Sequence, residues 1–218
     1  MIDDKNNTLL CLNSDGCEVP LFKGVNVKFE GHNSHVEIQK PNKINKLTII
    51  VGSNCRVHIG SNIKIINSVY IWATAEYSTL HIGDNCLLVD LNVSLKDEKN
   101  LSITIGNDCM TSSNVAIRSS DGHTIYDINN KQILNRPSEI IIEDHVWLGR
   151  GVEILKNTHI PKDCIVGMGS VVTKKFNDPN CVLVGRPAKV VRSGVNWSTK
   201  TTDEFEAFLK KQEIDRIN

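Results

Sequence analysis

The feature that most constrains this sequence is a repeat of six residues. From Ile142 onward a large aliphatic residue recurs at every sixth position: Ile142, Leu148, Ile154, Ile160, Val166 and Val172. A column of smaller residues follows four places after each: Val146, Val152, Thr158, Cys164 and Ser170. Neither column fits the 3.6-residue period of an α-helix. Two columns in one register are poorly explained by chance, so the repeat dictates the fold.

The same unit occurs upstream as "IGSNIK" from Ile59, "IGDNCL" from Ile82 and "IGNDCM" from Ile105. One large aliphatic, one small residue and a Gly, Asn or Asp turn describe a short strand followed by a corner. Three such units make one coil of a triangular prism, and stacked coils pair strand on strand about 4.8 Å apart. A single coil cannot bury its apolar face, so the repeats depend on one another. The sequence therefore predicts an all-β fold, a parallel β-helix of hexapeptide repeats.

The amino-acid composition argues against several classes of binding partner. The 25 basic residues balance the 25 acidic ones without a long run of one sign, which argues against binding to nucleic acid or to an anionic membrane. No secretory signal and no apolar run of membrane-spanning length are present, so a cytoplasmic location is expected. Seven cysteines without a CxxC pair favour reduced thiols, and the small inward position of the repeat accounts for four: Cys55, Cys86, Cys109 and Cys164.

Interruptions of the repeat divide the chain. Residues 1–46 carry a degraded pattern, which predicts capping strands or an irregular first coil, and residues 47–192 form the repeat domain. Short loops are expected at 77–81 and 96–100, and a long polar excursion extends over 119–138. Long excursions from a compact scaffold are usually functional, and His123 lies at the base of this one. In the tail, 193–218, Thr201 and Glu204 form a capping box, and Phe205, Phe208 and Leu209 give an apolar face, so a short C-terminal helix is expected.

Three segments together resemble a known family: "DGHTIYD" from Asp121, the block from Ile142 to Phe176 ("IEDHVWLGRGVEILKNTHIPKDCIVGMGSVVTKKF"), and "VGRPAKVVR" from Val184. They look like the hexapeptide-repeat O-acetyltransferases with a left-handed parallel β-helix. The closest subgroup comprises bacterial acetyltransferases that modify capsule or O-antigen sugars, the polysialic acid O-acetyltransferases among them. The match is specific from about Leu101 to Arg192. Left-handedness comes from the resemblance alone, because parallel connections are ordinarily right-handed.

The resemblance implies a homotrimer that binds acetyl-CoA in the groove between adjacent subunits and acetylates a sugar hydroxyl, sialic acid included. His123 is the implied catalytic base. A neutral imidazole accepts the hydroxyl proton at pH 7 and returns it to the thiolate, so neither an acyl-enzyme nor a metal is needed. Asp121 is a candidate for orienting the imidazole, although a backbone carbonyl serves equally and an acidic residue at such a turn is often an Asx-turn. The oxyanion donors implied are the indole N–H of Trp147 and backbone N–H groups near Gly149.

Glycines followed by basic residues suit the pantetheine and phosphates of coenzyme A, and Arg186 has a fork suited to phosphate. The cofactor-binding candidates are Trp147, Gly149, Gly167, Met168, Gly169, Lys174, Lys175, Arg186, Pro187 and Lys189. The acceptor pocket is expected to use the long loop and its surroundings, with Ser119, Tyr126, Asp127, Arg136 and His145 as candidates.

Three alternatives stay open. The same scaffold, cofactor and base serve N-acetylation of an amino sugar, free or nucleotide-linked, which differs in the acceptor pocket. A non-catalytic β-helix scaffold predicts no binding of coenzyme A. A zinc carbonic anhydrase needs three converging histidines, whereas His58, His81, His123, His145 and His159 are scattered along the chain.

Overall fold

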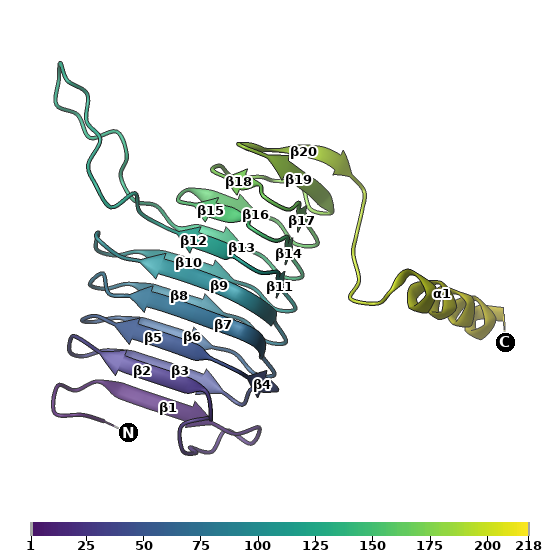
Figure 1. Ribbon diagram of the computed structural model, residues 1–218, viewed down its shortest axis with the longest axis horizontal. Coiled ribbons are helices and arrows are strands. Elements are labelled where there is room, and N and C mark those ends of the chain that lie inside the picture. Colours follow the sequence, from purple (N-terminus) through teal and green to yellow (C-terminus); the bar gives the residue numbers. More distant parts are fainter. Residues whose placement is uncertain (1, 218) are drawn as a thin grey trace.

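The computed structural model describes residues 2–217 and consists mainly of strands wound into a solenoid of about seven turns. Figure 1 shows the coils stacked from the N-terminal end upward, with a long arm leaving the upper coils on one side and a helix standing apart on the other. The all-β solenoid expected from the six-residue repeat is confirmed, together with one C-terminal helix.

One wall of the prism, face A, is a sheet of seven parallel strands. Its strand register pairs equivalent residues of successive coils. One column of isoleucines in this sheet consists of Ile59, Ile82, Ile105, Ile142 and Ile160. From bottom to top the strands are β1 (Thr8–Leu12), β3 (His35–Gln39), β6 (Arg56–Ile59), β8 (Thr79–Ile82), β10 (Ser102–Ile105), β13 (Ile140–Ile142) and β16 (Thr158–Ile160). Strand β8 starts at Thr79, so the loop expected at 77–81 is shorter than predicted.

The other two walls, faces B and C, belong to one 13-stranded sheet that turns a corner within β7 (Lys64–Ala73) and β9 (Leu87–Leu95). Face B contains the first residues of β7 and β9 with β4 (Lys43–Ile44), β11 (Met110–Thr111), β14 (Trp147–Leu148), β17 (Ile165–Val166) and β19 (Cys181–Gly185). Face C contains the remainder of β7 and β9 with β2 (Val25–Phe29), β5 (Leu47–Val51), β12 (Val115–Arg118), β15 (Glu153–Leu155) and β18 (Val171–Val172).

The interior of the prism is filled by the two columns that define the repeat. All six large aliphatics from Ile142 to Val172, and all five smaller residues between them, are at most 1% exposed. Burial of an aliphatic side chain of this size stabilises a fold by about 1.5–3 kcal/mol, so stacked coils gain what a lone coil cannot. The four cysteines at the small position are buried and unpaired, as predicted. Burial raises the pKa of the Cys55 and Cys164 thiols, which keeps them protonated.

The corners use residues that tolerate a left-handed backbone. Asn54, Asn62 and Asn85 have φ of 57°, 56° and 59°, a region that asparagine enters more readily than most residues. Their side chains also form ladders between coils, because Asn62 Nδ2 donates to Asn85 Oδ1 at 2.9 Å. The polar residues of the repeat thus occupy the positions where the chain turns.

The top coil ends in a hairpin, because β19 pairs antiparallel with β20 (Ala188–Ser193). The chain then descends along the solenoid and enters α1 (Thr202–Ile217). The predicted capping box is confirmed: Thr201 N–H donates to Glu204 Oε2 at 2.8 Å, and Glu204 N–H donates to Thr201 Oγ1 at 3.4 Å. Phe205, Phe208 and Leu209 are 40–46% exposed. Figure 1 shows the helix standing away from the prism, so its apolar residues have no wall to cover.

Candidate functional site

The long excursion over residues 119–138 is an ordered arm. It leaves the end of β12 on face C and returns into β13 on face A, so it projects from the corner that joins these faces. Tyr126 and Ile133 form an antiparallel bridge, and Leu134 N–H donates to Ile125 C=O at 2.8 Å. These contacts close the outer part of the arm into a hairpin (Figure 1).

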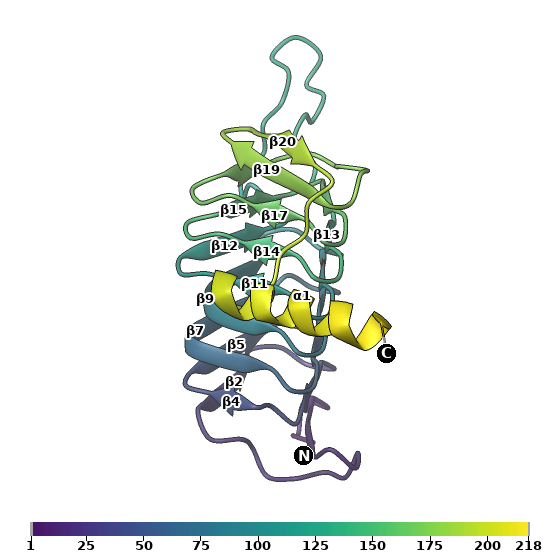
Figure 2. The same ribbon diagram turned by 90° about the vertical axis from the view of Figure 1, so that its right-hand side faces the viewer.

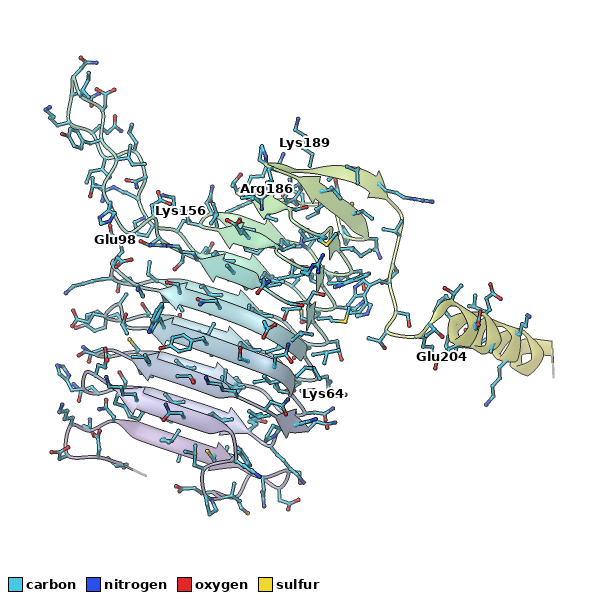
Figure 3. All side chains as sticks on the ribbon, viewed as in Figure 1. Lys64, Glu98, Lys156, Arg186, Lys189 and Glu204 are labelled. Atoms are coloured by element: carbon cyan, nitrogen blue, oxygen red, sulfur yellow. The ribbon has the colours of Figure 1, made fainter. Side chains whose placement is uncertain are left out.

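Three polar residues fasten the base of the arm. The Lys156 ammonium, presented from the end of β15, forms an ion pair with Asp121 and donates to Asn135 C=O at 2.8 Å. Asn135 Nδ2 in turn donates to Asp121 Oδ2 and to His123 C=O, both at 2.8 Å. Lys156, and then Asn135, lower the pKa of Asp121, so this carboxylate is ionised at neutral pH. Figure 3 marks Lys156 at the junction of the arm and the prism.

His123 lies at this base, directly after Gly122, with an exposed side chain. Its backbone is fixed by Asn135, but its imidazole makes no hydrogen bond or ion pair within residues 2–217. The carboxylate of Asp121 is committed to Lys156 and Asn135 instead of to this ring. Within one chain, therefore, the imidazole is free to meet another molecule, and Asp121 orients the arm rather than the ring.

The candidate acceptor residues on the arm have distinct surroundings. Ser119 is buried where the arm starts, and its N–H and Oγ face Ser94 C=O at 3.4 and 3.5 Å. Asp127 accepts hydrogen bonds from the N–H groups of Asn129 and Asn130, at 2.8 and 3.0 Å, and so shapes the hairpin turn. Tyr126, 51% exposed, and Arg136, also exposed, are the two whose side chains are open to a ligand.

A second group gathers at the corner between faces B and C. Gly149 follows β14 where the next coil passes closely: a Cβ there would lie 2.8 Å from Met168 N. Gly169 has φ of 70°, which favours glycine. Arg186 Nε donates to Gly169 C=O at 2.7 Å, and its guanidinium lies 3.5 Å from Glu153. Met168 is 65% exposed, whereas Gly167 and Gly169 are half-buried and Gly149 is buried, so this corner presents one flexible apolar side chain between partly covered glycines.

The remaining basic candidates are spread over the upper coils. Lys174 Nζ lies 5.1 Å from the Phe176 ring, and Lys175 pairs with Glu139 at 3.6 Å on the side of face A. Lys189 extends from β20, and Figure 3 shows it with Arg186 at the top of the prism. Pro187, joined to Arg186 by a cis peptide bond, forms the turn between β19 and β20. Arg186 and Lys189 therefore share one end of the molecule, whereas Lys175 lies near the arm.

Trp147 points outward from face B, as its place in the repeat predicts. It stands between Met110 and Ile165 in the cross-strand register. Its indole Nε1 is buried and has no hydrogen-bond partner within the described residues. An unpaired buried donor costs about 1–3 kcal/mol, so a group of this kind calls for an explanation.

Trp197, in the polar tail, lies against this site and was missed by sequence reasoning. Its ring packs 5.9 Å from that of Trp147 and is stacked on His145 at 4.3 Å. His145 is also bonded through Nδ1 to Asp163, at 2.9 Å, so its imidazole faces the tail and not the arm. The only local signal for Trp197 was a lone aromatic residue in the polar stretch "SGVNWSTK".

Within one chain these groups do not converge. Figures 1 and 2 show the arm at the far side of the prism from β14, β17 and the descending tail. His123 and Trp147 therefore lie on opposite sides of a single solenoid. Within residues 2–217 no group of three or more His, Cys, Asp and Glu side chains is arranged to hold a metal ion, and no helix is long and apolar enough to cross a bilayer.

The family model described as hexapeptide repeat of succinyl-transferase matches residues 139–174. The chain is 35% identical over 191 residues to the polysialic acid O-acetyltransferase of Neisseria meningitidis, covering 78% of this chain and 88% of that protein. It is 37% identical over 105 residues to the polysialic acid O-acetyltransferase of Escherichia coli O1:K1 / APEC. That second match covers 48% of this chain but spans only 33% of the longer relative.

A solved structure is similar throughout its length. The crystal structure of the polysialic acid O-acetyltransferase OatWY aligns with a TM-score of 0.72 at 26% sequence identity. The alignment covers 94% of this chain and 95% of that one.

Proposed function

Because this chain belongs to the hexapeptide-repeat acetyltransferases, and is of their sugar O-acetyltransferase kind, we propose that it acetylates a sugar hydroxyl in a bacterial surface polysaccharide. Acetyl-CoA is the acyl donor and sialic acid is among the expected acceptors. The observation that carries the proposal is the similarity to the Neisseria meningitidis protein over 88% of its length. Acetyl-CoA as donor and seven free thiols fit a cytoplasmic site of action.

His123 is the proposed general base. Its neutral imidazole takes the proton of the sugar hydroxyl while the oxygen attacks the thioester carbonyl. When the tetrahedral intermediate collapses, the C–S bond breaks and the same proton passes to the departing thiolate, so the histidine returns to its neutral state. The exposed ring of His123, which has no hydrogen-bond partner among the described residues, supports this role because the free nitrogen is available to the acceptor.

The oxyanion needs a donor aimed at it, and such a donor in a water-poor site contributes about 3 kcal/mol. The Gly149 N–H is an unsuitable donor, because it is bonded to Val166 C=O at 2.8 Å in the ladder between coils. The Trp147 Nε1–H has no such commitment. Trp147 is therefore the proposed donor, and the corner formed by the exposed Met168 and the half-buried Gly167 and Gly169, above Gly149, is the proposed path of the pantetheine.

The proposed active site lies between two subunits of a homotrimer. His123 and Trp147 lie on opposite sides of one prism, so a single site that uses both needs the arm of one copy beside face B of the next (Figures 1 and 2). Arg186 and Lys189, which lie together at the top of the prism, are the proposed contacts for the phosphates of coenzyme A. The apolar residues on the arm, among them Ile128 at 77% exposure, supply surface for such a contact.

An acceptor screen tests the proposal. Purified protein is given acetyl-CoA and a panel of oligosialic acid, neutral sugars and amino sugars, and the release of free coenzyme A thiol is followed. We expect thiol release with a hydroxyl acceptor, loss of turnover in His123→Ala, and retained turnover in His81→Ala, a matched exposed histidine on β8. Acetylation of amino sugars alone contradicts O-transfer, and an active His123→Ala rejects the assigned base.

A further inference from the structure

The segment that follows β20 returns to face B and is held there by hydrogen bonds. Val195 N–H donates to Asn180 C=O at 3.0 Å, and Asn196 Nδ2 lies 3.3 Å from Asp163 Oδ1. Trp197 Nε1 donates to the backbone C=O of His145 at 2.8 Å. Three successive residues of the tail are thus fixed to three different coils of the prism.

The indole of Trp197 is held in one orientation. It stacks on the imidazole of His145 with the ring centroids 4.3 Å apart and the planes 9° from parallel. His145 is itself fixed, because its Nδ1 is bonded to Asp163 at 2.9 Å. Parallel stacking plus a directional hydrogen bond restricts both the tilt and the rotation of Trp197.

This fixed ring lies against Trp147. The two indole centroids are 5.9 Å apart, with the planes inclined at 46°. The cross-strand neighbours of Trp147 on face B are the flexible side chain of Met110 and the aliphatic Ile165, and neither offers its indole N–H an acceptor. Nothing in the described chain ties the Trp147 indole by a hydrogen bond, so packing alone sets where its N–H points.

We propose that Trp197 is a positioning residue for acetyl transfer, because its clamped indole fixes the orientation of Trp147 and thereby aims the Trp147 N–H at the thioester oxygen. The inference rests on the proposed function, in which Trp147 is the donor. A donor that points slightly away from the oxyanion loses most of its stabilisation of the transition state, because the hydrogen bond must form with little rearrangement. Trp197 itself donates to His145 and so takes no part in the bond changes.

Trp197 contributes little to the fold, which makes the role separable from stability. Among the residues whose burial the structure describes, none beyond Ala188 belongs to the core, and the strand ladders end with β20. The tail is therefore an addition to a finished prism. Removal of the Trp197 ring is expected to leave the solenoid intact and to free Trp147.

Steady-state kinetics of five variants of the 218-residue chain test the inference. Trp197→Ala is expected to lower kcat about tenfold or more while the KM for acetyl-CoA changes less than about twofold, because the loss falls on the transition state. Trp197→Phe retains the stack on His145 and is expected to restore kcat to within about threefold of the parent. Phe208→Ala, which removes an exposed aromatic side chain on α1, is the matched control and is expected to keep full activity.

The double variant Trp147→Phe with Trp197→Ala completes the cycle. If Trp197 acts through Trp147, its loss has no further effect once the Trp147 N–H is gone. Equal losses in both backgrounds, or full activity in Trp197→Ala, overturn the inference while the donor role of Trp147 stands. Full activity in Trp147→Phe overturns the donor and the inference together. If Trp197→Ala does not fold, Trp197→Leu, which keeps bulk without the stack, takes its place with the same expected loss.

Discussion

At the scale of single residues, the buried N–H of Trp147 makes a prediction that separates activity from stability. Trp147→Phe retains an aromatic ring between Met110 and Ile165 but removes an N–H donor that has no hydrogen-bond partner within residues 2–217. We expect the free energy of unfolding to stay constant or rise slightly, because an unpaired buried donor is lost. Turnover is expected to fall about a hundredfold, the usual effect of one missing oxyanion donor. Denaturant titration and thiol-release kinetics measure the two effects, and a fall in both contradicts the assignment.

The ion pair at the base of the arm makes a prediction for pH. Lys156 lowers the pKa of Asp121 below its ordinary value, so the pair contributes its full stabilisation above the unfolded pKa of about 4 and loses it as the pH falls through the folded value. The arm base is therefore expected to be insensitive to pH between about 5 and 8 and to loosen only in stronger acid. Hydrogen exchange of the arm amides, corrected for the intrinsic effect of pH, follows this directly.

A substitution reproduces the acid effect at neutral pH. Lys156→Met removes the ammonium that holds both Asp121 and Asn135. We expect trypsin to cut after Lys131 in the arm faster than in the parent, with turnover reduced because His123 is no longer fixed at its backbone. Lys64→Met, on a distant coil, is the control (Figure 3). Unchanged cleavage would mean that the hairpin holds the arm without this pair.

Residue positions set by the repeat were predictable, and positions set by long-range contacts were not. The inward place of Cys55 or Ile154 follows from counting sixes, since every coil repeats the same corner. Trp197 reaches His145 across 52 residues of sequence, and Lys156 reaches Asp121 across 35. No local sequence pattern predicts contacts between residues so far apart in the chain. The contact of Trp197 with His145 and that of Lys156 with Asp121 are therefore visible only in the folded structure.

At the scale of elements, α1 shows which feature of a helix is determined by neighbouring residues in the sequence. Its start was predictable because Thr201 and Glu204 satisfy the first N–H groups within one turn. Its packing was not, because Phe205, Phe208 and Leu209 remain 40–46% exposed and contact no wall of the prism. An isolated helix of 16 residues is marginal in water, so its caps matter more than they would in a packed helix.

The cap can be removed without touching the prism. Thr201→Ala deletes the side-chain acceptor for the Glu204 N–H, and we expect the helical signal in far-ultraviolet circular dichroism to fall. The midpoint of thermal unfolding of the solenoid is expected to stay unchanged, because the helix stands apart from it. A parallel loss of solenoid stability would mean that α1 is packed against another copy in solution.

At the scale of the whole molecule, each coil touches only its neighbours, so damage should remain local. Ile38 on β3 and Ile154 on β15 are both fully buried isoleucines. Replacing either with alanine should lower the free energy of unfolding by about 2–5 kcal/mol. We expect kcat at low temperature to fall for Ile154→Ala, which lies next to Lys156 and the arm, and to persist for Ile38→Ala in the lower coils. Equal effects on kcat would mean that the prism responds as one rigid body.

A stack of similar parallel coils could in principle be extended by further coils at either end. The structures at the two ends of the solenoid therefore determine where the stack stops. At the bottom, Leu12 of β1 bridges antiparallel to Glu18, and at the top β20 folds back on β19, so the lowest strand of face A and the highest strand of face B each meet a segment of opposite direction. A reversed strand cannot template the next parallel rung, which closes the route to end-to-end filaments. We therefore expect the β19–β20 hairpin to keep the protein a discrete particle, and we expect its removal to appear as fibril growth in light scattering.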